Sequence, residues 1–159
     1  MRLAFLVNDV DTEVDEYATT RLARAAAKGG HETWYVGVGD LELGSSDGLF
    51  AARARAARWK SDDTLASFME GIKARDAERI FMDDLDALVL RNESIDDLQE
   101  RPWASPMGVV FGQMLADRGV TVVNDPNTLH RATSKLYLEE FPETVRPRSL
   151  VTRDSDAIE

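Results

Sequence analysis

The sequence predicts an α/β fold with an open, mainly parallel sheet and helices on both of its faces. Short apolar runs that end in polar clusters are typical of strands buried on both faces. Three such clusters follow runs of this kind, at residues 8–11, 91–93 and 124–127. Segments with helical spacing of apolar residues lie between the runs. Strands that alternate with helices form parallel crossover units, which gives the doubly wound class.

The first crossover unit occupies residues 3–38. Residues 3–7 form a continuous apolar run and are predicted as a buried strand. A helix is predicted over residues 15–28, because apolar residues share one face and Gly29-Gly30 supply a C-terminal stop. The residues of that face are Leu22, Ala25 and Ala26. Residues 33–38 are aromatic and β-branched enough for a second strand.

Residues 39–59 allow two interpretations. The Ala and Arg content of residues 50–59 favours a helix by propensity, whereas Ser46-Asp47-Gly48 is a turn signal that could join two strands of a hairpin. The residue pattern alone leaves both open. An amphipathic helix is predicted over residues 61–74, behind a Ser-Asp-Asp start. Its apolar positions fall at helical spacing: Leu65, Phe68, Met69 and Ile72.

The second half continues the alternation. A short strand is predicted at residues 80–82, a stronger one at 87–90 and another at 120–123. Between the last two, a helix is predicted with Ser105 at the cap, Pro106 at its first position and Gly119 just past its end. Its apolar residues are Met107, Val110, Phe111, Met114 and Leu115. Gly108 and Gly112 have a spacing that allows close packing.

A last helical pattern follows the third polar cluster. It passes through Leu129, Leu136 and Tyr137 and runs to Phe141-Pro142.

Composition narrows the function classes. The 159 residues fit one domain, and 43% hydrophobic with 30% charged residues are globular values. The net charge of -10 argues against nucleic acid and anionic membranes as partners. Without cysteine there is no disulfide, thiol nucleophile or Cys-ligated metal, and His31 and His130 leave little for metal or relay chemistry. The N-terminal apolar run is too short for a signal peptide or a membrane span, so a cytoplasmic protein is expected.

The polar clusters are the candidate site, since ligands of such sheets bind beyond the carboxyl ends of the strands. Arg91 is the most informative member, because a guanidinium directly after a strand offers a fork for a carboxylate or phosphate. The alternatives are that the clusters simply make turns, and that Arg91 forms a surface ion pair with Glu93 or a nearby Asp.

Motifs for other chemistry are absent or incomplete. No glycine-rich dinucleotide motif and no P-loop occurs. Asp9, Asp11 and Glu13 imitate the start of a calcium loop, but Val14 stands where glycine is needed, so they are interpreted as loop and helix-start acids. Two further clusters of charged residues are interpreted mainly as solvated surface. For the acids Asp83, Asp84 and Asp86 the alternative is that they bind a cation. For Arg53, Arg55 and Arg58 the alternative is that they bind an anion.

Several blocks of the sequence resemble the N-terminal part of prokaryotic glutathione synthetases and their ATP-grasp relatives, which include the ribosomal-protein glutamate ligases. The blocks are MRLAFLVND, RAAAKGGHETWYVGVGDLEL, LDALVLRNE, GVTVVNDPNTLHRATSKLYLEEFP and RPRSLVTRD. They follow the family's order over nearly the whole chain. The matching blocks are strong evidence for the family and weak evidence for the particular substrate.

The resemblance implies a Rossmann-like pre-ATP-grasp domain over residues 1–141, with a β-hairpin near residues 39–58. Residues 142–159 would connect it to an ATP-grasp domain that lies beyond this sequence. In the family the whole enzyme makes a peptide bond: ATP and magnesium convert a carboxylate to an acyl phosphate, which an amine attacks. The expected partners are therefore that ATP-grasp domain and an amino acid or peptide substrate, and a homo-oligomer is the further expectation.

The resemblance also implies roles for individual residues. Lys135 matches a lysine that contacts nucleotide phosphate, and Arg91 and Asn92 match the side of the strand that faces the acceptor substrate. No catalytic or metal-binding residue is expected in this chain, which alone should be inactive. The alternatives are a free-standing module that binds a small anionic metabolite, and an oligomerisation domain.

Overall fold

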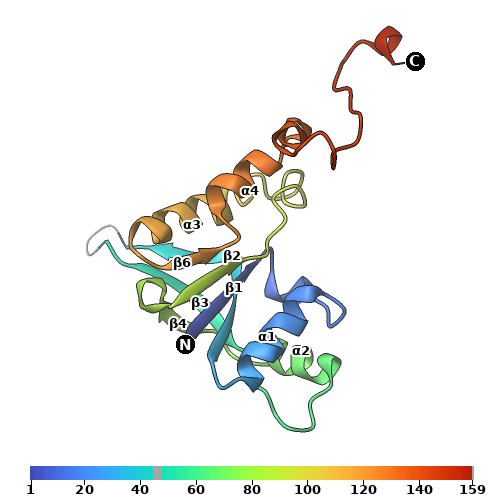
Figure 1. Cartoon of the computed structure of the whole chain (residues 1–159). Coiled ribbons are helices and arrows are strands. Elements are labelled where there is room, and N and C mark those ends of the chain that lie inside the picture. Colours follow the sequence, from blue (N-terminus) through green and yellow to red (C-terminus); the bar gives the residue numbers. More distant parts are fainter. Residues whose placement is uncertain (45–47, 159) are drawn as a thin grey trace.

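The central feature of the fold is a mixed sheet. A computed structural model describes residues 1–44 and 48–158 and forms from them a six-stranded sheet in the order β4-β3-β2-β1-β5-β6 (Figure 1). The strands are β1 (Arg2–Val7), β2 (Glu32–Leu43), β3 (Phe50–Ala56), β4 (Glu78–Phe81), β5 (Ala87–Leu90) and β6 (Thr121–Val123). β1 pairs in parallel with β2 and β5, and β5 with β6, whereas β3 is antiparallel to β2 and β4. The predicted α/β class is confirmed.

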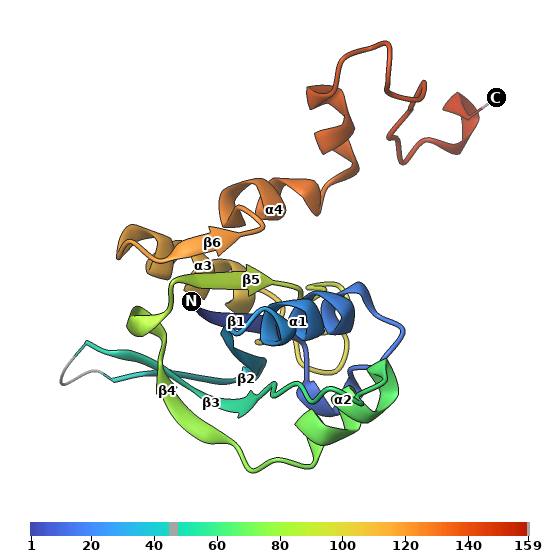
Figure 2. The same cartoon turned by 60° about the horizontal axis from the view of Figure 1, so that its bottom comes forward.

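Helices cover both faces of this sheet. α1 (Ala18–Lys28) and α2 (Leu65–Lys73) lie on one face, and α3 (Met107–Asp117) lies on the other with α4 (Pro126–Ala132) beside it (Figure 2). Four 3-10 helices complete the described part of the chain: η1 (Val10–Thr12), η2 (Met82–Asp84), η3 (Lys135–Glu140) and η4 (Ser155–Ala157). In the described residues no helix has the length and apolar character needed to cross a bilayer.

Strand β1 feeds a hydrophobic core on each side of the sheet. Ala4 and Leu6 pack in the cluster under α3, while Phe5 and Val7 pack in the cluster under α1 and α2. All four are buried. A large apolar side chain contributes about 1.5–3 kcal/mol when it leaves water, so the apolar run stabilises both layers at once.

The hairpin interpretation of residues 39–58 is correct. β2 and β3 pair in antiparallel fashion, with a register shift between Val36 and Leu41. Because β3 lies between β2 and β4, its backbone hydrogen-bonds on both sides, and this outweighs the helix propensity of alanine and arginine. The alanines Ala51, Ala52 and Ala54 are buried. Of the predicted turn, Ser46 and Asp47 lie outside the described residues, and Gly48 has the positive φ of 63° that favours glycine.

The prediction for α1 is wrong in its start and in its buried face. The helix begins at Ala18, and it buries Thr19, Thr20 and Ala23. Leu22 is 50% exposed, and Ala25 is exposed as well. The Thr20 hydroxyl donates to the carbonyl of Val14, so this face can meet the sheet without an unpaired hydroxyl.

Helix α2 is close to its prediction. It buries Phe68, Met69 and Ile72. The cap is Thr64 rather than the Ser-Asp-Asp stretch, because Thr64 and Ser67 form a reciprocal capping box.

The prediction for α3 is wrong in its cap and in two of the five residues of its apolar face. Pro106 is the N-cap, and within the described chain no side chain caps this end, so Ser105 does not have the predicted role. Val110 and Met114 are 42% and 37% exposed. The face that meets the sheet instead contains both glycines, because a side chain at Gly108 would collide with Asn92 and one at Gly112 would crowd Leu90 of β5. The predicted close packing is confirmed.

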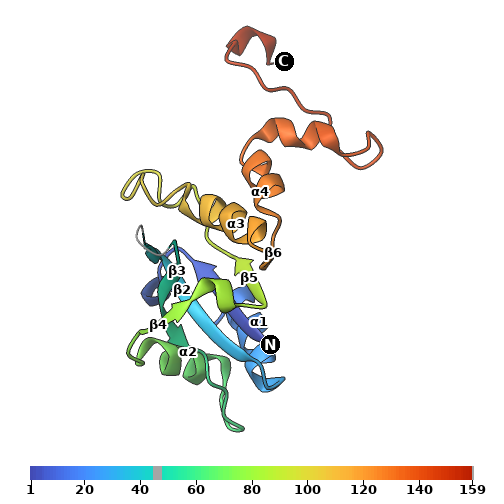
Figure 3. The ribbon, with the colours of Figure 1, turned by 90° about the vertical axis from the view of Figure 1, so that its left-hand side faces the viewer.

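The single helix predicted after the third cluster is two pieces. α4 ends at Ala132, and the chain is extended at Ser134 before η3 begins. The Thr133 hydroxyl donates to the carbonyl of His130, and the Ser134 hydroxyl accepts from the backbone N–H of Leu136. These local bonds compete with a continuous helix. The chain beyond α4 leads away from the sheet in all three views (Figures 1–3).

The two helical glycines Gly108 and Gly71 should respond oppositely to alanine. A methyl group at Gly108 overlaps the buried side chain of Asn92, so Gly108→Ala should lower the free energy of unfolding by about 1–3 kcal/mol. Gly71 lies in α2 with open space at its Cβ position, so Gly71→Ala should raise that free energy by about 0.5–1 kcal/mol. Urea unfolding measures both, and equal effects at the two positions would contradict the packing described.

Candidate functional site

The candidate site lies where the order of strands reverses. From β1 the chain passes through α1 to β2 on one side, and from β5 it passes through α3 to β6 on the other. The carboxyl ends of β1 and β5 therefore border the crevice in which ligands of such sheets bind. A pocket of about 450 Å³ lies at this point. We call it the switch-point pocket, and its lining is Asn8, Thr12, Glu13, Tyr17, Ala18, Thr19, Arg91, Glu93 and Asp96.

Arg91 brings a free cation to this pocket. Its backbone N–H donates to the carbonyl of Leu6 at 2.8 Å, which continues the pairing of β5 with β1. Its Nε donates to the Thr19 hydroxyl at 3.1 Å. Among residues 1–44 and 48–158 no carboxylate forms an ion pair with Arg91, so the predicted alternative of a surface ion pair is not seen. The guanidinium has donors left for a ligand.

The first turn of α1 lines the same pocket. Tyr17 is the N-cap of α1 and makes no side-chain cap bond, and the first turn carries no acidic residue in the described structure. Ala18 and Thr19 belong to the lining. Helix N-terminal N–H groups lack intrahelical acceptors and carry partial positive charge. The pocket therefore combines two groups that favour an anion.

Glu13 brings the opposite charge. It follows η1, is 7% exposed, and its Oε2 is buried with no hydrogen-bond partner among the described residues. Burial raises the pKa of Glu13 to about 7, although the nearby charges of Arg91 and Lys73 lower it. The sequence pattern predicts only an ordinary loop acid at this position and misses its burial. Glu13 lies in a loop, outside any periodic segment, so no pattern marks it as buried.

Asn8, at the end of β1, serves the structure of the pocket wall. Its Nδ2 donates to the carbonyl of Glu93 at 2.9 Å and to Oδ2 of Asp97 at 2.7 Å, and the backbone N–H of Glu93 donates to its Oδ1 at 2.7 Å. Asp97 also pairs with Arg101, which donates to the carbonyl of Asn8. These bonds fasten the segment after β5 to the end of β1. Asn8 therefore makes long-range bonds in the wall of the pocket rather than a local turn.

The structure does not bring Asn92 into the pocket with Arg91. Asn92 is 6% exposed and lies against Gly108 at the start of α3. Its Oδ1 and Nδ2 are buried without hydrogen-bond partners in the described part of the chain. Successive residues of an extended segment point to opposite faces, so Arg91 points to the α1 side and Asn92 to the α3 side.

Lys135 stands apart from the switch-point pocket. It begins η3 and is exposed, in the segment that leads away from the sheet (Figure 3). Two nearby arginines have acidic partners, Arg131 with Glu140 and Arg146 with Glu139. The third polar cluster has structural roles: Asn124 donates to the carbonyl of Leu90 at the end of β5, and Asp125 caps α4.

The other acidic and basic groups mostly bind within the chain. Asp83 accepts from the backbone N–H of Phe50, and Asp86 accepts from that of Arg2. Arg55 forms two hydrogen bonds with Asp11, which hold the pKa of Asp11 below its ordinary value. No group of three or more His, Asp or Glu side chains that could hold a metal ion occurs within the described ranges.

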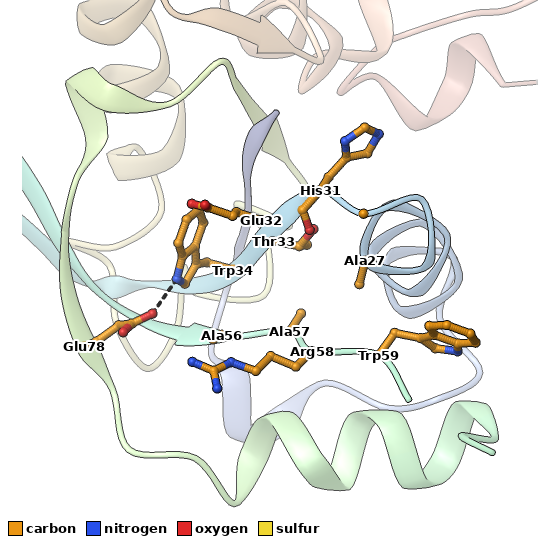
Figure 4. Close-up of a pocket in the computed structure, with 11 residues that line it drawn as sticks. Ala27, His31, Glu32, Thr33, Trp34, Ala56, Ala57, Arg58, Trp59 and Glu78 are labelled. Atoms are coloured by element: carbon orange, nitrogen blue, oxygen red, sulfur yellow. Dashed lines mark hydrogen bonds between the residues drawn. The ribbon is translucent and has the colours of Figure 1, made fainter. Parts of the chain in front are cut away.

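Another pocket, of about 500 Å³, lies at the opposite edge of the parallel strands. Figure 4 shows it between the start of β2 and the end of β3, with Trp34, Arg58 and Trp59 among the labelled side chains. The Trp34 indole N–H donates to Oε1 of Glu78 at 2.6 Å. This pocket lies at the amino ends of β1 and β2, whereas the switch-point pocket lies at the carboxyl ends of β1 and β5, so the two are separate.

Comparison with known families agrees with the fold. Residues 1–130 match the family described as prokaryotic glutathione synthetase, N-terminal domain. This range contains the whole sheet and the switch-point pocket. A search of curated proteins found no match.

Glu13 should make stability depend on pH. Because the folded pKa of about 7 exceeds the ordinary value of 4.5, ionising Glu13 in the folded protein is unfavourable, and this cost develops as pH rises from about 4.5 to 7. Glu13→Gln should therefore raise the free energy of unfolding at pH 8 by about 1–3 kcal/mol and change it little at pH 5. Urea unfolding at the two pH values measures this, and an effect of the same size at both would contradict it.

Asn8 should hold the segment that follows β5. Asn8→Ala removes three hydrogen bonds, so amide hydrogen exchange over residues 93–101 should quicken by about ten- to a hundredfold, while β1 and β2 keep their protection. Asn127→Ala is the control, because it loses only an exposed bond from Gln113. Unchanged exchange in the Asn8 variant would show that other contacts hold this segment.

Proposed function

Because the chain belongs to the family of the prokaryotic glutathione synthetase N-terminal domain, we propose that it is the substrate-side domain of an ATP-dependent ligase that joins a carboxylate to an amine. The family supports a glutathione synthetase-like ligase domain. The substrate-side role is supported by one observation above all: Arg91, free of ion pairs in the described structure, shares a pocket with the N-terminus of α1.

The proposed role of this chain is to bind and orient the substrate. A carboxylate in the switch-point pocket would accept hydrogen bonds from the Arg91 guanidinium and from the first N–H groups of α1. The Thr19 hydroxyl accepts from Nε of Arg91 and so limits the rotation of the guanidinium. The bonds that fasten residues 93–101 to Asn8 support the opposite wall. Fixed charges of this kind favour one orientation of the bound substrate.

The described residues do not by themselves fit magnesium or a nucleotide. They contain no group of three metal-binding side chains, and Lys135 is a single exposed cation outside both pockets. We therefore propose that ATP and magnesium bind to an ATP-grasp domain of the same polypeptide, joined through residues 142–159. The acyl phosphate chemistry implied by the family belongs to that domain, with Lys135 as one contact to phosphate. The proposed setting is the cytoplasm.

A second candidate is a free-standing module that binds a small anionic metabolite. The same pocket favours this module, because the groups that would bind the anion, Arg91 and the N-terminus of α1, both belong to this chain.

Self-association is supported separately by exposed apolar side chains on α3 and β6. They are Val110, Met114 and Val123.

Arg91 provides the test of the proposed function. In the full-length ligase, Arg91→Ala should raise the KM of the carboxylate substrate by about ten- to a hundredfold, because a charge-assisted hydrogen bond is lost, and leave the KM of ATP unchanged. Coupled measurement of ADP release gives both constants. Arg21→Ala, on the exposed side of α1, is the matched control.

Two outcomes would contradict the proposal. Equal changes in both KM values would mean that Arg91 acts through general stability. Carboxylate binding that depends on Arg91, in a full-length protein without ATP turnover, would favour the free-standing binding module.

A further inference from the structure

Resting on the proposed function, we infer that a proton on Glu13 controls anion binding in the switch-point pocket. The pocket binds a carboxylate more tightly when Glu13 is neutral than when Glu13 is ionised, so binding takes up a proton near neutral pH. Glu13 thus regulates the proposed substrate site through charge alone, whichever anion the pocket binds.

Glu13 and Arg91 come to the same pocket from different elements. Glu13 follows η1, and Arg91 follows β5. Within the described residues they form no ion pair with each other. Arg91 nevertheless lies near enough for its charge to lower the pKa of Glu13. An anion held by the Arg91 guanidinium would therefore also act on Glu13, and with the opposite sign.

Burial gives the charge of Glu13 its weight. The side chain is more than nine-tenths buried, and its Oε2 has no hydrogen-bond partner in the described structure. A charge removed from water is poorly screened, so it acts strongly on its neighbours. Burial also raises the pKa of Glu13 to about 7, as expected for a carboxyl group that loses its hydration. Both of its forms are therefore present at neutral pH.

The charged and titratable groups that face Glu13 come from three other elements. They are Arg91 after β5, Lys73 of α2 and Tyr35 of β2. The two cations lower the pKa of Glu13, but burial dominates. Burial raises the pKa of Tyr35, so its hydroxyl, which has no partner in the described ranges, stays a neutral donor beside Glu13. None of these three neighbours changes its charge near neutral pH.

The lining of the pocket also includes titratable groups that are exposed: Tyr17, Glu93 and Asp96. Water and salt screen exposed charges, so these groups act less on a bound anion than the buried Glu13 does. His31 lines the other pocket, and His130 lies on α4. The charge that changes beside Arg91 near neutral pH is therefore that of Glu13.

The direction of the linkage follows from these charges. An ionised Glu13 would repel a bound carboxylate and attract the Arg91 guanidinium that binds it. A bound anion in turn disfavours the ionised form of Glu13 and raises its pKa above the value of about 7 in the unbound pocket. The affinity should therefore be constant below about pH 6, fall as pH rises through 7, and level off above about pH 8.5.

The experiment measures anion binding on both sides of this range. Acetate and sulfate are the probes, because neither changes its charge between pH 6 and pH 8.5. The 159-residue chain, labelled with 15N, is titrated with each probe at constant ionic strength, and the amide shifts of Ala18, Thr19 and Arg91 give the Kd. At least one probe should bind at pH 6, and its Kd should be about three- to tenfold higher at pH 8.5.

The carboxyl group of Glu13 provides a direct readout. In the chain labelled with 13C, its resonance should titrate near pH 7, and at a higher pH when the probe is bound. This measurement uses the unaltered chain, so it does not depend on the folding of a variant. A titration of Glu13 that the bound probe leaves unchanged overturns the inference.

Glu13→Gln should bind the probe with the same Kd at both pH values. Glu16→Gln, an exposed acid three residues along, is the matched control and should keep the pH dependence. Circular dichroism of each variant reports its folding. A pH dependence that survives Glu13→Gln overturns the inference. So does an equal Kd of the unaltered chain at both pH values, or no binding of either probe at pH 6.

The outcome separates this inference from the proposed function. If a probe binds, loses affinity in Arg91→Ala and has the same Kd at both pH values, Glu13 does not control the pocket and the substrate-side role stands. If the affinity follows the proton on Glu13 but the full-length protein has no ATP turnover, the control by Glu13 stands and the ligase function fails.

Discussion

The structure depends on the burial of β1 between two layers. Its side chains alternate between the cluster under α3 and the cluster under α1 and α2, and its backbone pairs in parallel with strands on both sides. The buried part of such a strand does not tolerate polar side chains, so polar groups can follow only where it ends. That end, beside the end of β5, is where the chain departs toward opposite faces, and the switch-point pocket forms there.

The elements that lie under this constraint could be predicted from the sequence, and those that depend on tertiary contacts could not. The strands of the parallel part are continuous apolar runs, and their pattern identifies them. In β3, alanine and arginine favour a helix, and only its position between two strands makes it extended. Leu22 in α1 shows the same limit: its residue type indicates burial, but small threonines give a closer approach to the sheet.

Part of the candidate site could likewise be predicted from the sequence, and part of it could not. A cation after an apolar strand could be located from the sequence, and Arg91 does line the pocket. Asn92, its neighbour, follows the same pattern but lies under α3, because adjacent residues of an extended chain face opposite layers. Glu13 could not be identified, since its burial arises from tertiary packing and leaves no periodic mark. The family match covers the strands of the sheet and every residue that lines the pocket, and it assigns a role to none of them.

The opposite facing of Arg91 and Asn92 constrains how this domain can change by insertion and deletion. Loss of one residue within β5 would put the Asn92 amide in the pocket and the Arg91 guanidinium in the place of the buried Leu90. Gain of one residue would put that guanidinium where Asn92 now lies, beneath the first turn of α3. Gly108 leaves room there for an asparagine side chain and no more, and an arginine buried in its place would lack a counter-charge. The length of β5 is therefore under a double restriction, whereas residues 57–64, between β3 and α2, lie outside the strands and could gain a residue without changing which layer Arg91 or Asn92 faces.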